Sequence, residues 1–391
     1  MRVLTISLTL FSAIAFAGEY TIPESVKNTL KSAAANAPEL ELALTKCPDD
    51  QRKGMVFLIE HMPTKDAQTL KAEYLLENVS LAYQARNEMP WGKEIPEDIF
   101  LNDVIPYASL DESRDSWRKD FYQRFRAIAG DSKSALEALT KINTAIEKET
   151  GVQYNTKRRA ANQGPAESMQ LKMASCTGLS ILFVDALRAV GIPARIAGIA
   201  MWTNKDGNHN WIEVWLPERK IWQFGEYNPD KAGLDHGWLL ADAARGVPGS
   251  IVHAIYATSW KKTDKHFPMV WDFDATTVPA VDVTQRYVDL GAKTLAKPGE
   301  CELRIDAYKT ANGEAKREAV TIEVRQFDIV VAKGTTPSAT ADMNNFLSIR
   351  VPQGVRYQVI IPGSAGQKPL AMEEIAPKDK QENLRIKLTI P

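Results

Sequence analysis

The segment from Ala174 to Asp230 constrains the fold most, because its apolar pattern changes period within a short span. After Cys176, apolar residues recur at helical spacing as far as Val190, which predicts an amphipathic helix. A Gly-Ile-Pro sequence then ends the helix, since glycine is favoured at helix C-termini and proline follows it. Further on, the residues of His209–Leu216 alternate between two faces, which predicts a strand. After a polar turn the chain continues as a second predicted strand. The segment therefore predicts a helix packed on an antiparallel sheet.

The regions on either side of this segment have different patterns. Residues 18–145 contain several stretches with apolar residues at helical spacing and predict a helical N-terminal region. Residues 281–391 contain short alternating stretches separated by Gly, Pro and Asn, which predict a β-sandwich accessory domain. Residues 146–280 hold the helix and hairpin and form the predicted core domain. The expected fold class is therefore α+β.

Two stretches of the predicted core domain have no regular period. Residues 154–170 are polar and predict an extended loop that leads into the Cys176 helix. Residues 231–280 are expected to be irregular and to wrap around the core, with their aromatic residues buried.

The first residues have the pattern of a secretory signal peptide at 1–17. A positive start, Met1-Arg2, precedes an apolar run that is too short to span a bilayer, and Ala15-Phe16-Ala17 forms an A-x-A cleavage pattern. No later stretch is long and apolar enough to predict a transmembrane anchor. We therefore expect an exported protein, periplasmic or extracellular, whose mature chain begins near Gly18.

Charge and composition limit the partners of the chain. Its 391 residues are 44% hydrophobic and 25% charged, and the formal net charge is −1. No global positive field favours nucleic acid or an anionic membrane, so no nucleic-acid partner is predicted. The composition leaves the oligomeric state open.

The chain has three cysteines, Cys47, Cys176 and Cys301, which is few for an exported protein. They permit at most one internal disulfide, and the odd number leaves at least one free thiol. Either Cys47 pairs with Cys301 or both are buried, and in both cases Cys176 stays free.

Cys176 is the first candidate for chemistry because it stands at the start of the predicted helix. The positive end of the helix dipole favours a thiolate there, which lowers the pKa of the thiol. Unpaired backbone N–H groups of the first turn could also bind an oxyanion. The alternative is a small buried residue without chemistry, as many free cysteines are.

His209 opens the first strand of the hairpin, and two possible partners lie on its face of the sheet. If Leu216 pairs with Ile221, Asn228 stands opposite His209 and Glu226 lies diagonally from it. Opposed residues are about 4.5–5.5 Å apart at Cβ, and diagonal ones about 7–8 Å. A lone histidine in a strand is most often structural, but a cysteine before it and a carboxylate or amide after it suggest a thiol enzyme.

Taken together, residues 174–226 resemble the transglutaminase-like branch of the papain-type thiol enzymes. The resemblance rests on Cys176 before a helix, the run Leu-Arg-x-x-Gly-Ile-Pro-Ala-Arg at 187–195, and His-x-Trp-x-Glu-Val from His209. Trp222, four residues before Glu226, completes the pattern. A longer region, 57–287, resembles exported bacterial members of that group. The implied fold is a papain/transglutaminase-like core.

The resemblance implies a role for each candidate residue. Cys176 would be the nucleophile and His209 the general base and acid, with a third residue that orients the imidazole. The family usually has Asp at the third position; here the match falls on Glu226, which we favour, and Asn228 is the alternative. Gln170 has the spacing that papain-type proteases use for an oxyanion-hole side chain, although a solvated loop residue would explain it as well.

The predicted function is hydrolysis of peptide or side-chain amide bonds through a cysteine thioester, favoured over transglutamination because water is abundant. The expected partner is a protein or peptide substrate. The alternatives are a non-catalytic binding protein with a decayed transglutaminase-like core, or a peptide N-glycanase-like amidase. The sequence predicts no metal and no cofactor, since the other histidines have no ligand spacing and no nucleotide-binding loop is present.

Overall fold

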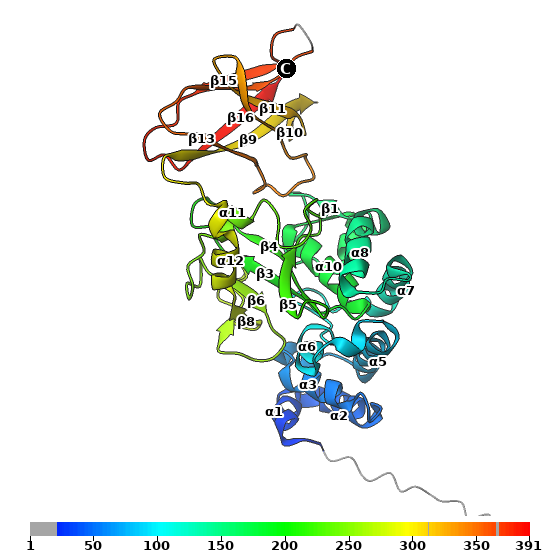
Figure 1. Ribbon diagram of the computed structural model, residues 1–391. Coiled ribbons are helices and arrows are strands. Elements are labelled where there is room, and N and C mark those ends of the chain that lie inside the picture. The colour runs from blue at the N-terminus through cyan, green and yellow to red at the C-terminus, as the bar shows by residue number, and fades with distance from the viewer. Residues whose placement is uncertain (1–21, 312, 365–366) are drawn as a thin grey trace, which may run out of the picture.

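The computed structural model describes residues 22–391 except 312 and 365–366, and the predicted signal peptide at 1–17 lies outside the described residues. The helices of the N-terminal region, the mixed core and the C-terminal sheets follow one another along the molecule (Figure 1). In the described part of the chain, no helix has the length and apolar character needed to cross a membrane. The α+β fold class is confirmed.

The N-terminal region is helical, as predicted. Its helices are α1 (Glu24–Ser32), α2 (Ala37–Lys46), α3 (Arg52–His61), α4 (Thr64–Ala67), α5 (Ala72–Glu88), α6 (Glu97–Asp103), α7 (Arg118–Ala129) and α8 (Ala135–Thr150), with 3-10 turns η1 (Ala34–Asn36) and η2 (Gly92–Glu94). One continuous buried cluster extends from Val26 in α1 to Ala280 in the core sheet. The helices therefore brace the region around Cys176 through shared apolar packing.

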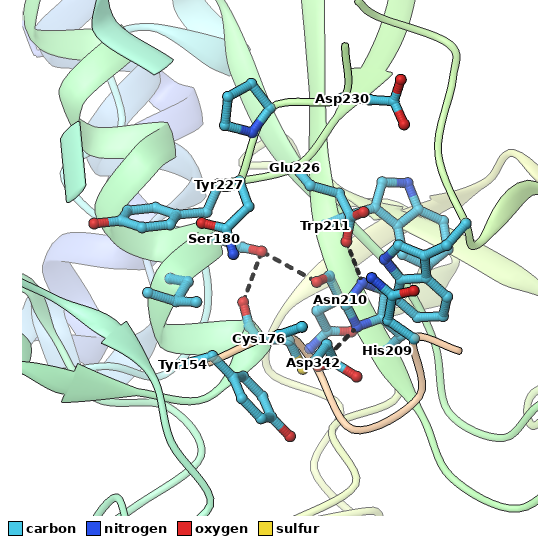
Figure 2. Close-up of a pocket in the computed structure, with 16 residues that line it drawn as sticks. Tyr154, Cys176, Ser180, His209, Asn210, Trp211, Glu226, Tyr227, Asp230 and Asp342 are labelled. Atoms are coloured by element: carbon cyan, nitrogen blue, oxygen red, sulfur yellow. Dashed lines mark hydrogen bonds and ion pairs between the residues drawn. The ribbon is translucent and has the colours of Figure 1, made fainter. Parts of the chain in front are cut away.

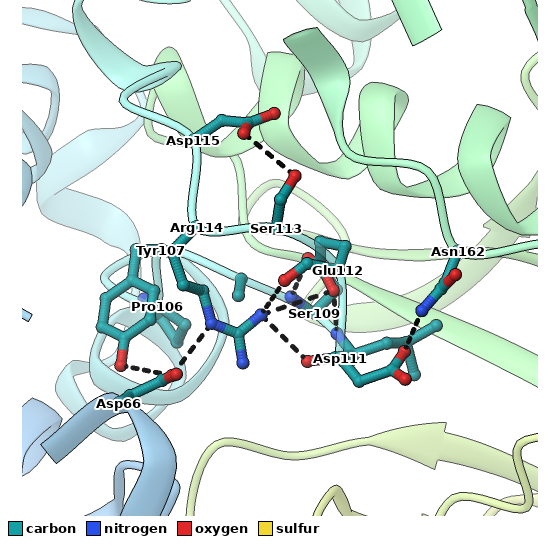
Figure 3. Close-up of polar contacts among 12 residues, drawn as sticks. Asp66, Pro106, Tyr107, Ser109, Asp111, Glu112, Ser113, Arg114, Asp115 and Asn162 are labelled. Atoms are coloured by element: carbon teal, nitrogen blue, oxygen red, sulfur yellow. Dashed lines mark hydrogen bonds and ion pairs between the residues drawn. The ribbon is translucent and has the colours of Figure 1, made fainter. Parts of the chain in front are cut away.

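A buried polar network fixes the segment between α6 and α7 (Figure 3). Glu112 accepts hydrogen bonds from the backbone N–H groups of Ser109 and Leu110, both at 2.7 Å. Arg114 Nε lies 2.9 Å from Asp66 Oδ2, which also accepts a hydrogen bond from Tyr107 at 2.8 Å. These charge-assisted bonds hold an irregular segment whose backbone has no regular helix or sheet hydrogen bonds.

The core contains the predicted helix and hairpin. Helix α10 (Cys176–Ala189) packs on a sheet whose strands run in the order β5-β4-β3-β6-β8-β7. These strands are β3 (Ala194–Ile199), β4 (His209–Leu216), β5 (Ile221–Gly225), β6 (Ile255–Thr258), β7 (Lys265–His266) and β8 (Pro279–Asp282). The predicted register is confirmed, since Leu216 pairs with Ile221 and Ile212 with Gly225.

Two expectations for the core were wrong. The predicted loop at 154–170 contains a helix, α9 (Pro165–Leu171), because Gly164-Pro165 begins a helix rather than interrupting a loop. The stretch 231–280 is not irregular throughout: β6, β7 and β8 extend the sheet, and α11 (Leu240–Ala243) lies between them and the hairpin. The remaining elements nearby are β1 (Gln153–Tyr154), β2 (Met173–Ala174), α12 (Thr284–Gly291) and η3 (Ala292–Thr294).

The C-terminal strands form two packed four-stranded sheets, as predicted for a β-sandwich. One sheet contains β9 (Glu300–Ala311), β10 (Glu314–Arg317), β13 (Leu347–Pro352) and β16 (Asn383–Ile390); the other contains β11 (Thr321–Gln326), β12 (Ile329–Thr335), β14 (Tyr357–Ile361) and β15 (Ala371–Ile375). Alternating residues of the two sheets form a core of their own. The domain boundaries at 145/146 and 280/281 stay predictions.

The three cysteines all lie in the described part of the chain, and all are free. Cys47 is buried among the N-terminal helices and Cys301 in the C-terminal sheets, so the two thiols belong to separate cores. The structure thus has the second of the two predicted arrangements, without a Cys47–Cys301 disulfide. Burial raises the pKa of the Cys47 thiol to about 11, whereas Cys176 is partly exposed.

Candidate active site

Cys176 is the first residue of α10, and the local sequence explains why the helix begins there. Ser175 adopts an extended backbone and its hydroxyl accepts a hydrogen bond from the Gly178 N–H at 3.1 Å. This N-cap ends the preceding strand and starts the helix at the cysteine. The thiol therefore stands at the positive end of a long buried helix.

The first turn of α10 is fastened to the start of β4. Ser180 Oγ donates to the carbonyl of Cys176 at 2.8 Å and also lies 3.2 Å from the carbonyl of Asn210. Asn210 in turn donates from Nδ2 to Thr177 Oγ1 at 2.8 Å. These bonds fix the spacing between the helix start and the strand start, and so between the thiol and His209 (Figure 2).

His209 is almost fully buried, and its Nε2 lies 2.7 Å from Glu226 Oε1. Strand β5 ends at Gly225, opposite Ile212, so Glu226 leaves the ladder and turns its side chain toward the ring. Asn228, the other predicted partner, is exposed and lines the same cavity without a recorded contact to His209 among the described residues. The geometry joins His209 to Glu226; the catalytic role of this pair stays a prediction.

Aromatic side chains hold the imidazole from the sides. Trp202 and Trp211 stack near the ring with interplanar angles of 25°, and Trp238 lies 4.7 Å from its centroid. This packing excludes water and restricts rotation of the ring. Trp238, expected only to be a buried residue of the wrapping segment, thus also contributes a wall of the site.

Asp342 completes the cluster and was not predicted. It lies in the connection between β12 and β13, and its Oδ2 is 3.4 Å from His209 Nδ1. Single ligand atoms of Cys176, His209 and Asp342 all lie within 4.8 Å of one another. The sequence has no signal for this contact, because a single Asp in a turn of the sandwich has no period or spacing that relates it to the hairpin.

The connection that contains Asp342 is anchored on both sides. Arg317 donates to the Asp342 carbonyl at 2.8 Å and to the Asp306 carboxylate at 2.9 Å. On the side of the core, Asn344 donates to the Asn208 carbonyl at 3.0 Å. These contacts place the carboxylate over the catalytic candidates at a defined position.

The electrostatics of the cluster favour a charged imidazole. Burial lowers the pKa of His209, but the Asp342 carboxylate, the Cys176 thiol and Glu226 outweigh this effect and raise it well above its ordinary value. Burial raises the pKa of Asp342, but His209 and the Asn344 donors outweigh it, so the net shift is downward. The two shifts agree and indicate an imidazolium–carboxylate pair.

The other motif residues of the sequence pattern form a buried cluster beneath the site. Glu213, fully buried on β4, accepts from Arg195 Nε at 2.9 Å and from Arg286 Nη1 at 2.6 Å. The Arg195 guanidinium also lies 4.0 Å from the Trp222 ring centroid. Arg195, Glu213 and Trp222 therefore connect β3, β4 and β5 through their side chains.

A cavity of about 220 Å³ opens beside Cys176, His209, Glu226 and Asp342. Gln170 is absent from its described lining residues; it is exposed on α9, so the expected oxyanion-hole side chain is not brought to the thiol. A larger cavity of about 800 Å³ adjoins the Glu112 network and contains no cysteine. Of these two cavities, the smaller one is therefore the one lined by a cysteine.

A family profile matches the part of the chain that contains Cys176 and His209. Residues 123–243 match the family profile of the Transglutaminase-like superfamily, and no curated protein matches the chain. A candidate cysteine protease from Cytophaga hutchinsonii is 19% identical, covers 34% of this chain and 44% of its own, and has a TM-score of 0.27. Red sea bream transglutaminase is 10% identical, covers 74% and 65%, and has a TM-score of 0.33. The chain thus spans less than two thirds of either structure.

The chain therefore carries a transglutaminase-like domain at 123–243, and its Cys176 and His209 lie close to Asp342 from the C-terminal region. The matched residues contain Cys176, His209 and Glu226, whereas Asp342 lies beyond them in the C-terminal sheets.

Proposed function

We propose that the protein is a cysteine-dependent enzyme that acts on amide bonds of proteins or peptides by acyl transfer. The supporting observation is the 2.7 Å contact between His209 Nε2 and Glu226 Oε1, which leaves Nδ1 on the side of Cys176 and Asp342. A carboxylate that fixes one ring nitrogen while the other serves the nucleophile is the arrangement that thiol and serine acyl-transfer enzymes need.

The proposed reaction has two halves. The Cys176 thiolate attacks the amide carbonyl carbon, and the backbone N–H groups at the start of α10 stabilise the oxyanion. The C–N bond breaks as His209 passes its Nδ1 proton to the leaving amine, and a thioester remains. His209 then takes a proton from water, whose oxygen attacks the thioester and releases the acid and the thiol.

Hydrolysis is the favoured second half because water is the abundant acceptor in an open cavity. An amine in place of water would give transglutamination by the same first half. The two outcomes are separated by incubating the enzyme and a glutamine-containing peptide with and without a fluorescent amine. Release of ammonia without incorporation of the amine supports hydrolysis, and incorporation supports transglutamination.

Covalent labelling tests the nucleophile directly. A thiol-directed electrophile should modify the native protein once, at Cys176, and Cys176→Ala should remove the label together with any turnover. Cys47→Ala and Cys301→Ala are matched controls, because both thiols are buried and should leave labelling unchanged. Persistent labelling of Cys176→Ala would contradict the proposal, and slow labelling with the pH dependence of an ordinary thiol would favour a non-catalytic binding protein.

We also propose that the protein is exported after cleavage before Gly18. The support is the apolar run and the Ala15-Phe16-Ala17 pattern. N-terminal sequencing of the protein from a cell fraction outside the cytoplasm should give Gly18 first; a retained Met1 in that fraction would contradict cleavage.

A further inference from the structure

The cluster of Cys176, His209 and Asp342 has a geometry that thiol acyl transfer does not require. A charge-assisted N–H···O bond is about 2.7–2.9 Å long. The 3.4 Å ion pair between His209 Nδ1 and Asp342 Oδ2 is longer, and neither buried atom makes a hydrogen bond with the described residues. Buried polar atoms that lack a hydrogen bond are uncommon and ask for an explanation.

The same spacing matches two ligands of one tetrahedral ion. Zinc binds imidazole nitrogen at about 2.0–2.1 Å and carboxylate oxygen at about 2.0–2.2 Å, which separates the two atoms by about 3.4 Å. A thiolate at about 2.3 Å would lie about 3.6 Å from each of them. The ligand atom of Cys176 is within 4.8 Å of both, so a small shift of the sulfur would close the set.

Both fixed ligands have the outer hydrogen bonds that metal ligands use. Nε2 of His209 faces Glu226, which leaves Nδ1 directed at the cluster, where loss of its proton would expose a lone pair to a metal ion. Asp342 Oδ1 accepts from Asn344 N at 2.8 Å and from Asn344 Nδ2 at 3.0 Å, which leaves Oδ2 facing His209 Nδ1. Such partners set the tautomer of the histidine and the orientation of the carboxylate.

We infer that Cys176, His209 and Asp342 form a zinc site, with the cavity of about 220 Å³ providing the open fourth position for water. Thiolate, imidazole and carboxylate together suit Zn²⁺ better than Mg²⁺ or Ca²⁺. Binding releases the proton of the Cys176 thiol and the Nδ1 proton of the imidazolium, so that a thiolate and a neutral imidazole become ligands. The sequence did not predict this site because its third ligand comes from the distant β12–β13 connection.

Zinc at this position is an inhibitor if the proposed function holds, and this consequence rests on that proposal. The ion would take the thiolate that attacks the carbonyl and the ring nitrogen that transfers the proton. It would also tie the β12–β13 connection to α10 and β4. Binding itself rests only on the geometry.

Zinc binding is measured by competition of the full-length, chelator-treated protein with a chromophoric chelator. Wild type should bind one equivalent, and Asp342→Asn should weaken binding about 100-fold by removing an anionic ligand. Asn344→Ala and Glu226→Gln should weaken it about 10-fold through lost orientation. Asp230→Asn is the matched control, because this exposed carboxylate lines the same cavity and should leave affinity unchanged.

A second measurement identifies the thiolate. Co²⁺ added to the metal-free protein should give a thiolate charge-transfer band that Cys176→Ser lacks, and Zn²⁺ should protect Cys176 from alkylation until a chelator is added. Equal zinc affinity of wild type and Asp342→Asn, or no binding at all, would overturn the site. If zinc binds and protects Cys176 while the metal-free protein turns over no amide, the proposed function fails and the zinc site stands.

Discussion

Two carboxylates reach His209 from different regions of the molecule, and they are held in different ways. Glu226 follows the β4–β5 hairpin directly and meets Nε2 at 2.7 Å, a normal charge-assisted bond. Asp342 comes from the connection between two sandwich strands and stops 3.4 Å from Nδ1. The hairpin contact follows from where β5 ends and the chain turns, whereas the sandwich contact depends on how the C-terminal sheets pack against the core. The hairpin thus supplies orientation of the imidazole, and the connection supplies charge.

Removing Glu226, the carboxylate that follows the hairpin, should have the largest effect on the rate of acylation. Glu226→Ala frees the imidazole to rotate and should lower the rate of Cys176 acylation about 10³-fold, within the range of positioned acid–base groups. Glu226→Gln keeps an acceptor oxygen at the same reach and should lose less. Single-turnover acylation of both variants gives the comparison. Equal loss in the two would show that charge, rather than orientation, is what Glu226 provides.

Substitution at the contact between β4 and α10 should have the next largest effect, a loss of stability. A Cβ at position 198 would stand 1.9 Å from Asn210 Oδ1, so Gly198→Ala must displace the side chain that bonds Thr177. Overpacking of this kind costs about 1–3 kcal/mol of unfolding free energy. Urea unfolding measures the loss. The double variant Gly198→Ala/Asn210→Ala removes the clashing atom and should recover part of it; no recovery would contradict the stated cause.

Replacing Asp342, the carboxylate from the sandwich, should have the smallest effect, and its effect on stability should depend on pH. In metal-free protein, Asp342→Asn should cost about 1–2 kcal/mol of unfolding free energy, the order of a hydrogen bond to a charged group. Because the pKa of His209 is raised in the folded protein, its contribution is full below the ordinary histidine value of about 6.5 and is lost as pH rises through the folded pKa. Because the pKa of Asp342 is lowered, its contribution is full above about 3.9 and is lost as pH falls.

The stability difference between wild type and Asp342→Asn should therefore be largest between about pH 4 and 6.5 and decrease on the alkaline side. Unfolding midpoints in urea from about pH 4 to well above pH 6.5 test it, with Asp230→Asn as the matched control because Asp230 is exposed. A difference that grows with pH above 6.5 would contradict the imidazolium–carboxylate pair.

Much of the core could be predicted because its pattern is local. The apolar period after Cys176 predicts α10, and alternation from His209 predicts β4 with His209 and Trp211 on one face. The pairing of Leu216 with Ile221 followed from the short polar turn. The errors lie where the local pattern is weak. Gly164-Pro165 is interpreted as part of a loop but begins α9, and the strands within 255–282 are too short to show a period.

The sequence by itself determined the thiol at a helix start, the histidine at a strand start, and the two candidates for its partner. Only the tertiary structure decided that Glu226 makes the contact, because β5 ends at Gly225 and the chain turns before Asn228 can stand opposite His209. It alone also brought Asp342 to the other ring nitrogen. Helix and strand periods arise from neighbouring residues, whereas this last contact depends on packing two separate cores, which no local period records.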